Sequence, residues 1–255
     1  MDHGIHRGTL AMPHVRRITA DRPLAWLRAG WADIRANPLP SLAYGVLFAL
    51  GGDLIILAAL SHPHLLTVAI SGFFLVAPLL AAGLYELSRG RAYGEKLMFI
   101  DSLRCFKRNG QSLAIFGLIL ALTAMFWERV SAVAFALIAI DTPGAGSVFL
   151  HELLINGEHL PFTLAWFAVG GMLALFVYAL AVVSVPLMLD RDTDAATAML
   201  TSIQAFTTNV GPLLLWAALI VGLVLLGFAT LLFGLVVLMP ILGHASWHAY
   251  RELVE

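Results

Sequence analysis

Long stretches without a single charged side chain constrain the fold of this chain more than any other feature. Residues 65–84, for example, contain no Asp, Glu, Lys or Arg and are almost entirely apolar. About 18 to 20 such residues cross the roughly 30 Å hydrocarbon core of a bilayer as a helix. Only 12% of the 255 residues are charged, whereas soluble domains carry about 25%. The chain is therefore predicted to be an all-α, polytopic membrane protein.

The apolar runs predict six membrane spans. Four of them are placed at residues 39–60, 65–87, 112–140 and 161–189. The last apolar stretch, residues 211–250, is too long for one span, since its first 32 residues alone make a helix of about 48 Å. We expect it to form a hairpin that turns near Gly227.

The positive charges predict the orientation, because Lys and Arg accumulate on the cytoplasmic side of a membrane. Six of them precede the first span, six lie in the connection 88–111, and Arg191 lies in the connection 190–210. Residues 61–64 and 141–160 contain none. The N-terminus is predicted to be cytoplasmic, and so is the C-terminus if the last stretch is a hairpin. The net charge of -1 suggests no nucleic-acid partner, and the single Cys105 excludes an intrachain disulfide.

An internal repeat supports the hairpin. Asn37, Asn109 and Asn209 each stand just before a span, and the residue seven positions earlier is small in every case. Apolar residues stand three, six and ten positions earlier, in the sets Ile34, Trp31, Leu27; Phe106, Leu103, Phe99; and Phe206, Ile203, Met199. This pattern predicts an amphipathic interfacial helix before each hairpin, although helical spacing alone also produces such offsets.

The return arm of each predicted hairpin carries a proline, at Pro78, Pro186 and Pro240. We therefore expect a membrane helical bundle of three hairpins, each preceded by an interfacial helix. The cytoplasmic tail would cover residues 1–22, and a single membrane domain would cover 23–255, with repeats at about 23–87, 97–189 and 194–250.

Two strings of the sequence carry a family resemblance. Residues 185–199 read Val-Pro-Leu-Met-Leu-Asp-Arg-Asp-Thr-Asp-Ala-Ala-Thr-Ala-Met, and residues 239–251 read Met-Pro-Ile-Leu-Gly-His-Ala-Ser-Trp-His-Ala-Tyr-Arg. With these, the chain from about Pro23 to its end resembles an uncharacterised bacterial family of predicted integral membrane proteins, a domain of unknown function. The resemblance implies a bacterial inner-membrane location and brings no substrate or catalytic residue.

Three ionisable residues fall inside predicted spans, where a charge costs several kcal/mol unless it is paired or hydrated. Asp53 lies in the first span, and Glu128 with Arg129 lies in the third. The repeat places Asp53 and Arg129 at similar depth, which predicts a pair between these spans. The alternative is a structural bridge, or an Arg129 that reaches the outer interface.

Histidines are the other candidates. His244 and His248 are four residues apart and share one helical face, so they are possible ligands, but a hydrogen-bonding, interface-anchoring role beside Trp247 and Tyr250 needs fewer partners. No metal site is predicted from them. The predicted outer side gathers His62, His64, His151 and His159 with Glu152 and Glu158, which we interpret as loop residues. Asp190, Asp192 and Asp194 precede a predicted helix and are expected to cap it rather than to bind a cation.

The sequence lacks the phosphate loop, the G-x-S-x-G and the H-E-x-x-H motifs, so no catalytic residue and no enzymatic activity are predicted. The leading hypothesis is a multi-pass inner-membrane protein without a cofactor, either transporter-like or an accessory scaffold. Its basic inner helices, which include Arg28, Arg35 and Arg104, suit anionic inner-leaflet lipids. The alternative is a haem- or copper-binding subunit associated with a respiratory membrane complex. Substrate, oligomeric state and protein partners stay open at this point.

Overall fold

The computed structural model describes residues 12–61, 81–139 and 160–255, and these residues are almost all helical. The helices are α1 (Arg22–Ala36), α2 (Pro38–Ser61), α4 (Phe99–Ser102), α5 (Cys105–Arg108), α6 (Gly110–Ala139), α8 (Leu160–Ala181), α9 (Ser184–Arg191), α10 (Ala195–Thr208), α11 (Val210–Ala229) and α12 (Leu235–Leu253). Residues 81–92 form a further helical segment. The described part contains no strand, and only one isolated antiparallel bridge joins Val15 to Val254.

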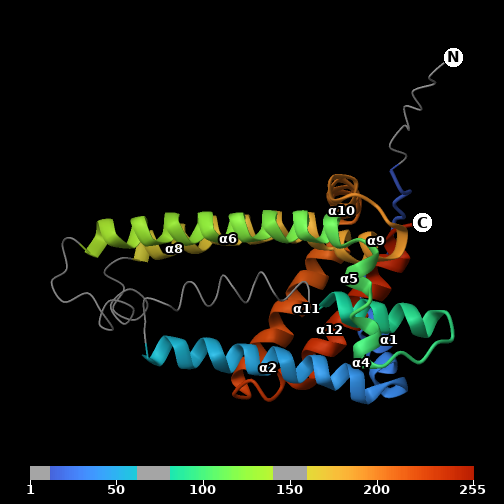
Figure 1. Cartoon of the computed structure of the whole chain (residues 1–255). Coiled ribbons are helices and arrows are strands. Elements are labelled where there is room, and N and C mark those ends of the chain that lie inside the picture. The colour runs from blue at the N-terminus through green and yellow to red at the C-terminus, as the bar shows by residue number, and fades with distance from the viewer. Residues whose placement is uncertain (1–11, 62–80, 140–159) are drawn as a thin grey trace, which may run out of the picture.

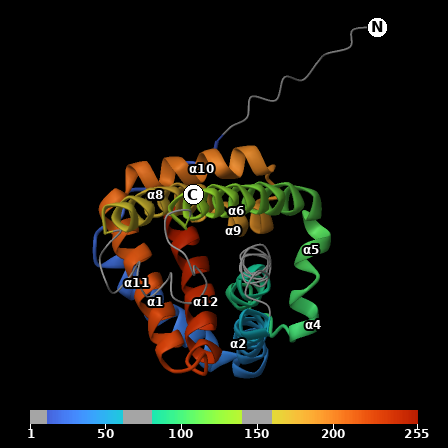
Figure 2. The same ribbon diagram turned by 90° about the vertical axis from the view of Figure 1, so that its left-hand side faces the viewer.

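The long helices extend from one layer of shorter elements. In Figure 1, α2, α6 and α8 all extend to the same side of a group that contains α1, α4, α5, α9, α10 and both described chain ends. Viewed along these helices in Figure 2, α6 and α8 lie together under α10, whereas α2 lies on the opposite side. We call the group of short elements the basal layer.

The protein core lies in the basal layer and in the parts of α2, α11 and α12 that adjoin it, rather than along the far parts of the long helices. Trp26, Trp216, Trp247 and Tyr250 are almost completely buried there, and the rings of Trp26 and Trp216 meet edge to face at 5.6 Å between centroids. Away from this layer the long helices expose large apolar side chains such as Leu54, Phe126 and Met172. This distribution is typical of helices whose outer surface contacts lipid chains instead of water.

Four helices among the described residues are long and apolar enough to cross a membrane: Pro38–Ile55, Gly110–Ala134, Leu160–Arg191 and Val210–Ala229. They correspond to the predicted first, third and fourth spans and to the first half of the final stretch. Most of the predicted second span, with Pro78, lies outside the described residues. The final stretch consists of two helices, with the turn at residues 230–234 rather than at Gly227.

Helical segments precede all three asparagines, although the second is divided into two single-turn helices, α4 and α5. The small residues Gly30, Ser102 and Ser202 are buried, whereas Trp31 and Leu103 of the apolar stripes are each 39% exposed. A Cβ atom on Gly30 would lie 2.6 Å from the carbonyl oxygen of Ile241 in α12. The small face therefore packs on the protein, because only small residues let the backbones approach this closely.

The three asparagines of the repeat share one backbone geometry. Asn37, Asn109 and Asn209 follow the ends of α1, α5 and α10, with φ, ψ of -143°, 70°; -140°, 48°; and -129°, 42°. Each side-chain amide also donates to the backbone segment that precedes the next interfacial helix, and the third closes the cycle. The acceptors are Leu97 for Asn37, Thr193 for Asn109 and Arg16 for Asn209.

Candidate functional site

A buried polar cluster around Asp33 is the most concentrated group of chemically active side chains in the described part of the chain. It joins four elements, because Asp33 comes from α1, Ser41 from α2, Ser88 and Arg91 from the helical segment 81–92, and His244 and His248 from α12. The Asp33 side chain is only 5% exposed. We call this group the Asp33 cluster.

The Asp33 carboxylate has a donor on each oxygen. Ser88 donates its hydroxyl to Oδ2 at 2.5 Å, His248 Nε2 lies 3.0 Å from the same oxygen, and Arg91 pairs with Oδ1. Burial opposes ionisation of Asp33, but the hydrogen bonds from His248 and Ser88 outweigh it and lower the pKa of the carboxyl below its ordinary value. Asp33 is therefore a carboxylate at neutral pH.

Both ring nitrogens of His244 are engaged. Nδ1 lies 2.7 Å from the Ser88 hydroxyl, and Nε2 lies 2.9 Å from the Ser41 hydroxyl. Because Ser88 gives its proton to Asp33, it accepts from Nδ1–H, and Nε2 of the neutral ring then accepts from Ser41. Ser41 also lies 2.8 Å from the carbonyl oxygen of Asn37, so rotation of one hydroxyl switches its proton between two acceptors.

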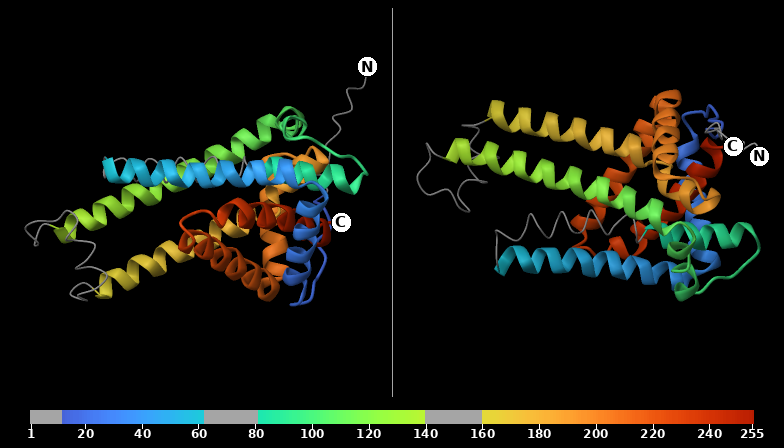
Figure 3. Two further views of the ribbon diagram at one scale, coloured as in Figure 1. Left: turned by 90° about the horizontal axis from the view of Figure 1, so that it is seen from below. Right: turned by 45° about the horizontal axis from the view of Figure 1, so that its top comes forward.

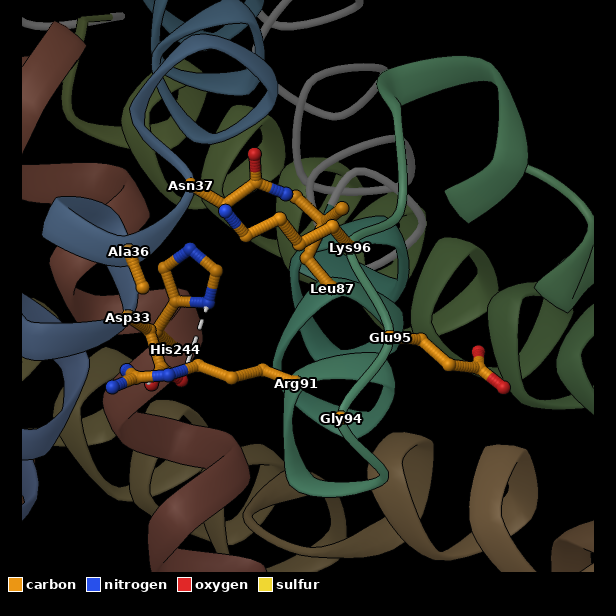
Figure 4. A pocket seen from close by; sticks show the side chains of 9 residues that line it. All are labelled: Asp33, Ala36, Asn37, Leu87, Arg91, Gly94, Glu95, Lys96 and His244. Atoms are coloured by element: carbon orange, nitrogen blue, oxygen red, sulfur yellow. Dashed lines mark hydrogen bonds and ion pairs between the residues drawn. The ribbon is translucent and has the colours of Figure 1, made fainter.

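A pocket of about 180 Å³ opens beside this cluster. Figure 4 shows Asp33, Arg91 and His244 gathered on one side of it, whereas Glu95 points away from the other labelled side chains. Ser41 does not line the pocket. The pocket therefore gives access to Asp33, Arg91 and His244 of the cluster but not to the hydroxyl of Ser41.

Ser41, His244 and Asp33 are the residue types of a serine hydrolase triad, in which a hydroxyl, an imidazole and a carboxylate are bonded in that order. Here Ser88 stands between the imidazole and the carboxylate, and His244 Nδ1 is 3.8 Å from Asp33 Oδ2. Ser41 has no exposed surface. A nucleophile must reach its substrate, so this geometry favours a structural bridge between helices over acyl transfer.

A second buried charge group fixes the neighbouring connection. Glu86 accepts two bonds from Arg89, at 2.9 and 2.7 Å, and two from Arg108, at 2.6 and 3.5 Å. Arg108 is the last residue of α5, so this group ties the second interfacial helix to the helical segment 81–92. Bidentate arginine–carboxylate geometry of this kind is well suited to fixing orientation.

The structure brings His244 and His248 together at Asp33 and not at the acids near Asp190. The prediction that Trp247 and Tyr250 lie at the membrane interface is wrong, because these side chains are 2% and 0% exposed and belong to the core. Among the described residues, no three His, Cys, Asp or Glu side chains gather as a metal site.

The intramembrane candidates are arranged differently from the prediction. Arg129 pairs with its neighbour Glu128 at 2.7 Å, and the predicted pair between Arg129 and Asp53 does not form. No described residue forms a hydrogen bond or ion pair with Asp53, which is exposed on α2. The physical reason is separation, since α2 and α6 emerge on different sides of the basal layer (Figure 2).

The acids near residue 190 have separate structural roles. Asp194 caps α10 by accepting from Thr197 N at 2.9 Å, so the capping prediction is confirmed for Asp194, whereas Asp192 lies at the C-terminal end of α9. Asp190 accepts from the Tyr250 hydroxyl at 2.7 Å and from Arg251. The outer histidines and glutamates (His62, His64, His151, His159, Glu152 and Glu158) lie outside the described residues.

The sequence reasoning missed Asp33, Ser41, Ser88 and Arg91. One signal was present for Asp33, because it follows Trp26 and Gly30 by seven and three residues and so lies on the small face of its helix. Ser41 and Ser88 carried no comparable signal, since isolated serines are common in apolar helices. Their role depends on helix packing, which the pattern of one helix does not reveal.

Comparison with known families identifies one match. Residues 65–190 match the family model described as predicted integral membrane protein (DUF2189). Over this stretch the chain matches an uncharacterised family of integral membrane proteins. The match confirms the resemblance inferred above, although the closing Gly-His-Ala-x-Trp-His-Ala-Tyr run lies outside the matched residues. No curated protein and no solved structure matches the chain. The matched residues contain Ser88, Arg91 and Glu86, but not Asp33 or His244.

Proposed function

We propose that this protein is a non-enzymatic scaffold of the bacterial inner membrane, built from three helical units that enter the bilayer from a common cytoplasmic layer. The observation that carries the proposal is the closed cycle of asparagine bonds, which links each unit to the next at the basal layer. The Asp33 cluster adds buried bonds between the first and third units. Such fixed interfaces favour a scaffold over a transporter whose repeats rock against each other.

The cytoplasmic orientation follows from charge. Among the described lysines and arginines, only Arg129 lies away from the basal layer. The two ends of the described chain meet there, since Glu255 N donates to the carbonyl of His14 at 2.9 Å. By the positive-inside rule, this layer and both termini face the cytoplasm.

Anionic lipids are the proposed partners of the basal layer. Arg28, Arg35, Arg104 and Lys107 are exposed on its helices, and Arg35 stacks over the half-exposed ring of Trp31 at 5.1 Å. Each such charge near an anionic surface contributes about 1 kcal/mol to membrane attachment. No single lipid headgroup is selected by this arrangement.

A haem- or copper-binding subunit is the alternative. It would require His244 or His248 to give up the hydrogen bonds with Ser41, Ser88 and Asp33 in favour of a metal. Stoichiometric metal or haem in the purified protein, lost in the His244→Ala variant, would favour this alternative.

The scaffold is tested by whether its units move. Spin labels on Arg28→Cys in α1 and Leu200→Cys in α10, in a Cys105→Ala background, report the distance between the first and third units. We expect one narrow distance distribution in proteoliposomes, unchanged by an imposed proton gradient. The singly labelled variants serve as controls. Two populations, or a shift with the gradient, would indicate a rocking transporter instead.

A further inference from the structure

The turn between α11 and α12 consists mainly of apolar residues, whereas turns that face water consist mainly of polar ones. Its residues are Thr230, Leu231, Leu232, Phe233 and Gly234, and Leu231 and Phe233 are each 79% exposed. Leu231 and Leu232 have φ of 52° and 68°, a region that glycine and asparagine occupy more easily. Two leucines at such positions, where a turn in water would carry glycine or asparagine, indicate that the turn lies in an apolar environment.

The depth of this turn follows from two contacts with α2. His244 of α12 bonds to Ser41, which lies one turn into α2, and the turn ends about ten residues before His244. A Cβ atom on Gly52 would lie 2.9 Å from Leu232 Cδ1, so Leu232 packs at the level of Gly52. Both contacts place the turn about 15 Å above the level of Ser41. The apolar window of α2 begins at Pro38, so if the hydrocarbon core begins there, the turn lies about half of its 30 Å thickness deep.

The neighbouring helices continue beyond this level. α2 extends from Gly52 to Ser61, which adds about 14 Å of helix. The views in Figure 3 show the turn between α11 and α12 ending well short of the far ends of α2, α6 and α8. Although α11 has 20 residues, it is inclined to the long helices and does not reach their far ends (Figure 1).

The backbone of the turn satisfies its own donors. The N–H groups of Thr230, Leu231, Leu232, Phe233, Leu235, Val236 and Val237 all donate to backbone carbonyls within residues 226–234. The Thr230 hydroxyl accepts from Gly234 N at 2.9 Å and donates to the carbonyl of Gly227 at 2.8 Å. Non-helical backbone inside a bilayer is costly because water is absent, and this internal bonding removes the cost for its donors.

From these observations we propose that α11 and α12 form a re-entrant hairpin whose turn is inserted among lipid acyl chains near the middle of the bilayer. The chain then crosses the membrane with two units only, and the third unit enters and leaves on the cytoplasmic side. This inference rests on the membrane orientation proposed above, and it replaces two of the six predicted spans.

Depth measurement tests the hairpin. A nitroxide on Phe233→Cys in the Cys105→Ala background is compared with Leu54→Cys on α2, two residues from Gly52, and with Leu39→Cys at the start of α2. All three positions are exposed on the described surface, so labelling does not disturb packing. We expect the ratio of oxygen to nickel-chelate accessibility at residue 233 to equal that at residue 54 and to exceed that at residue 39 at least several-fold.

Chemical access supplies the second measurement. A membrane-impermeant maleimide should label Phe233→Cys at less than about one-tenth of the rate of Arg28→Cys in inverted vesicles and of Glu158→Cys in spheroplasts. Labelling from outside at the rate of Glu158→Cys would show a full crossing and overturn the re-entrant hairpin. Labelling of Arg28→Cys from outside would instead overturn the proposed orientation, and the depth of residue 233 would still decide the hairpin.

Discussion

The first and third interfacial helices occupy equivalent places in the repeat but contain different chemistry. In α10 the face directed into the protein carries Ala198, Ser202 and Ala205, before Asn209. In α1 the equivalent positions are occupied by Trp26, Gly30 and Asp33, before Asn37. The shared asparagine and small residue account for the common seating of the two helices, whereas a charge four residues before the asparagine is found only in α1.

The difference separates the positions of the repeat that fix how the helices pack from the one position that forms specific polar contacts. Positions that must allow close approach, or tie one unit to the next, are alike in all three units. The ionisable position occurs once, as Asp33, where α1 meets the helical segment 81–92 and α12. Cys105 and Ala205 occupy this position in the other two units and are buried without charge.

The strongest test of this comparison removes the charge from α1. Asp33→Ala should lower the free energy of unfolding by about 3–5 kcal/mol, because it leaves Arg91, His248 and Ser88 without their shared acceptor. Thermal unfolding in one detergent, followed by circular dichroism, measures the loss. Glu95→Ala is the matched control, since Glu95 lines the same pocket, is exposed, and its carboxylate bonds to no described residue.

The pH dependence separates the charge of Asp33 from its packing. The pKa of Asp33 is lowered in the folded protein, so its stabilisation is complete above the ordinary carboxyl pKa and is lost as the pH falls through the lowered value. Asp33→Asn should therefore differ from wild type at neutral pH and approach it in acid. An equal difference at all pH values would assign the effect to shape alone.

The next test concerns the close approach that all three units share. Gly30→Ala should destabilise by about 1–3 kcal/mol, because the new Cβ would meet Ile241 O at 2.6 Å and Ala245 N at 2.8 Å. Gly211→Ala is the control, since no atom lies within 4 Å of its added Cβ. An unchanged melting temperature for Gly30→Ala would mean that α1 is not packed on α12 as described.

The sequence was sufficient for features that repeat along one helix. It predicted the apolar helices, helical structure before each asparagine, and the two-helix nature of the final stretch. It was insufficient where partners come from distant elements. Asp33 bonds to His248, which lies 215 positions away in the sequence. Which face of each helix is buried also depends on the neighbouring helix that it packs against. Apolar residues face lipid as readily as protein in a membrane, so hydrophobicity alone assigned Trp247 to the wrong surroundings.

The smallest expected effect concerns the bond that closes the cycle of units. Asn209 donates to Arg16 O at 2.9 Å and accepts from Ile18 N at 2.9 Å, so it holds the segment before α1 against the third unit. Asn209→Ala should cost about 1 kcal/mol, because the freed backbone groups lie near the surface and can bond to water. The sharper readout is local, since residues 16 and 17 are both arginines. Trypsin should cleave there several-fold faster in Asn209→Ala than in wild type, whereas Thr207→Ala, an exposed change on the same helix, should leave the rate unchanged. Equal cleavage of Asn209→Ala and wild type would show that the first and third units are held together without this bond, and that the cycle is open at this point.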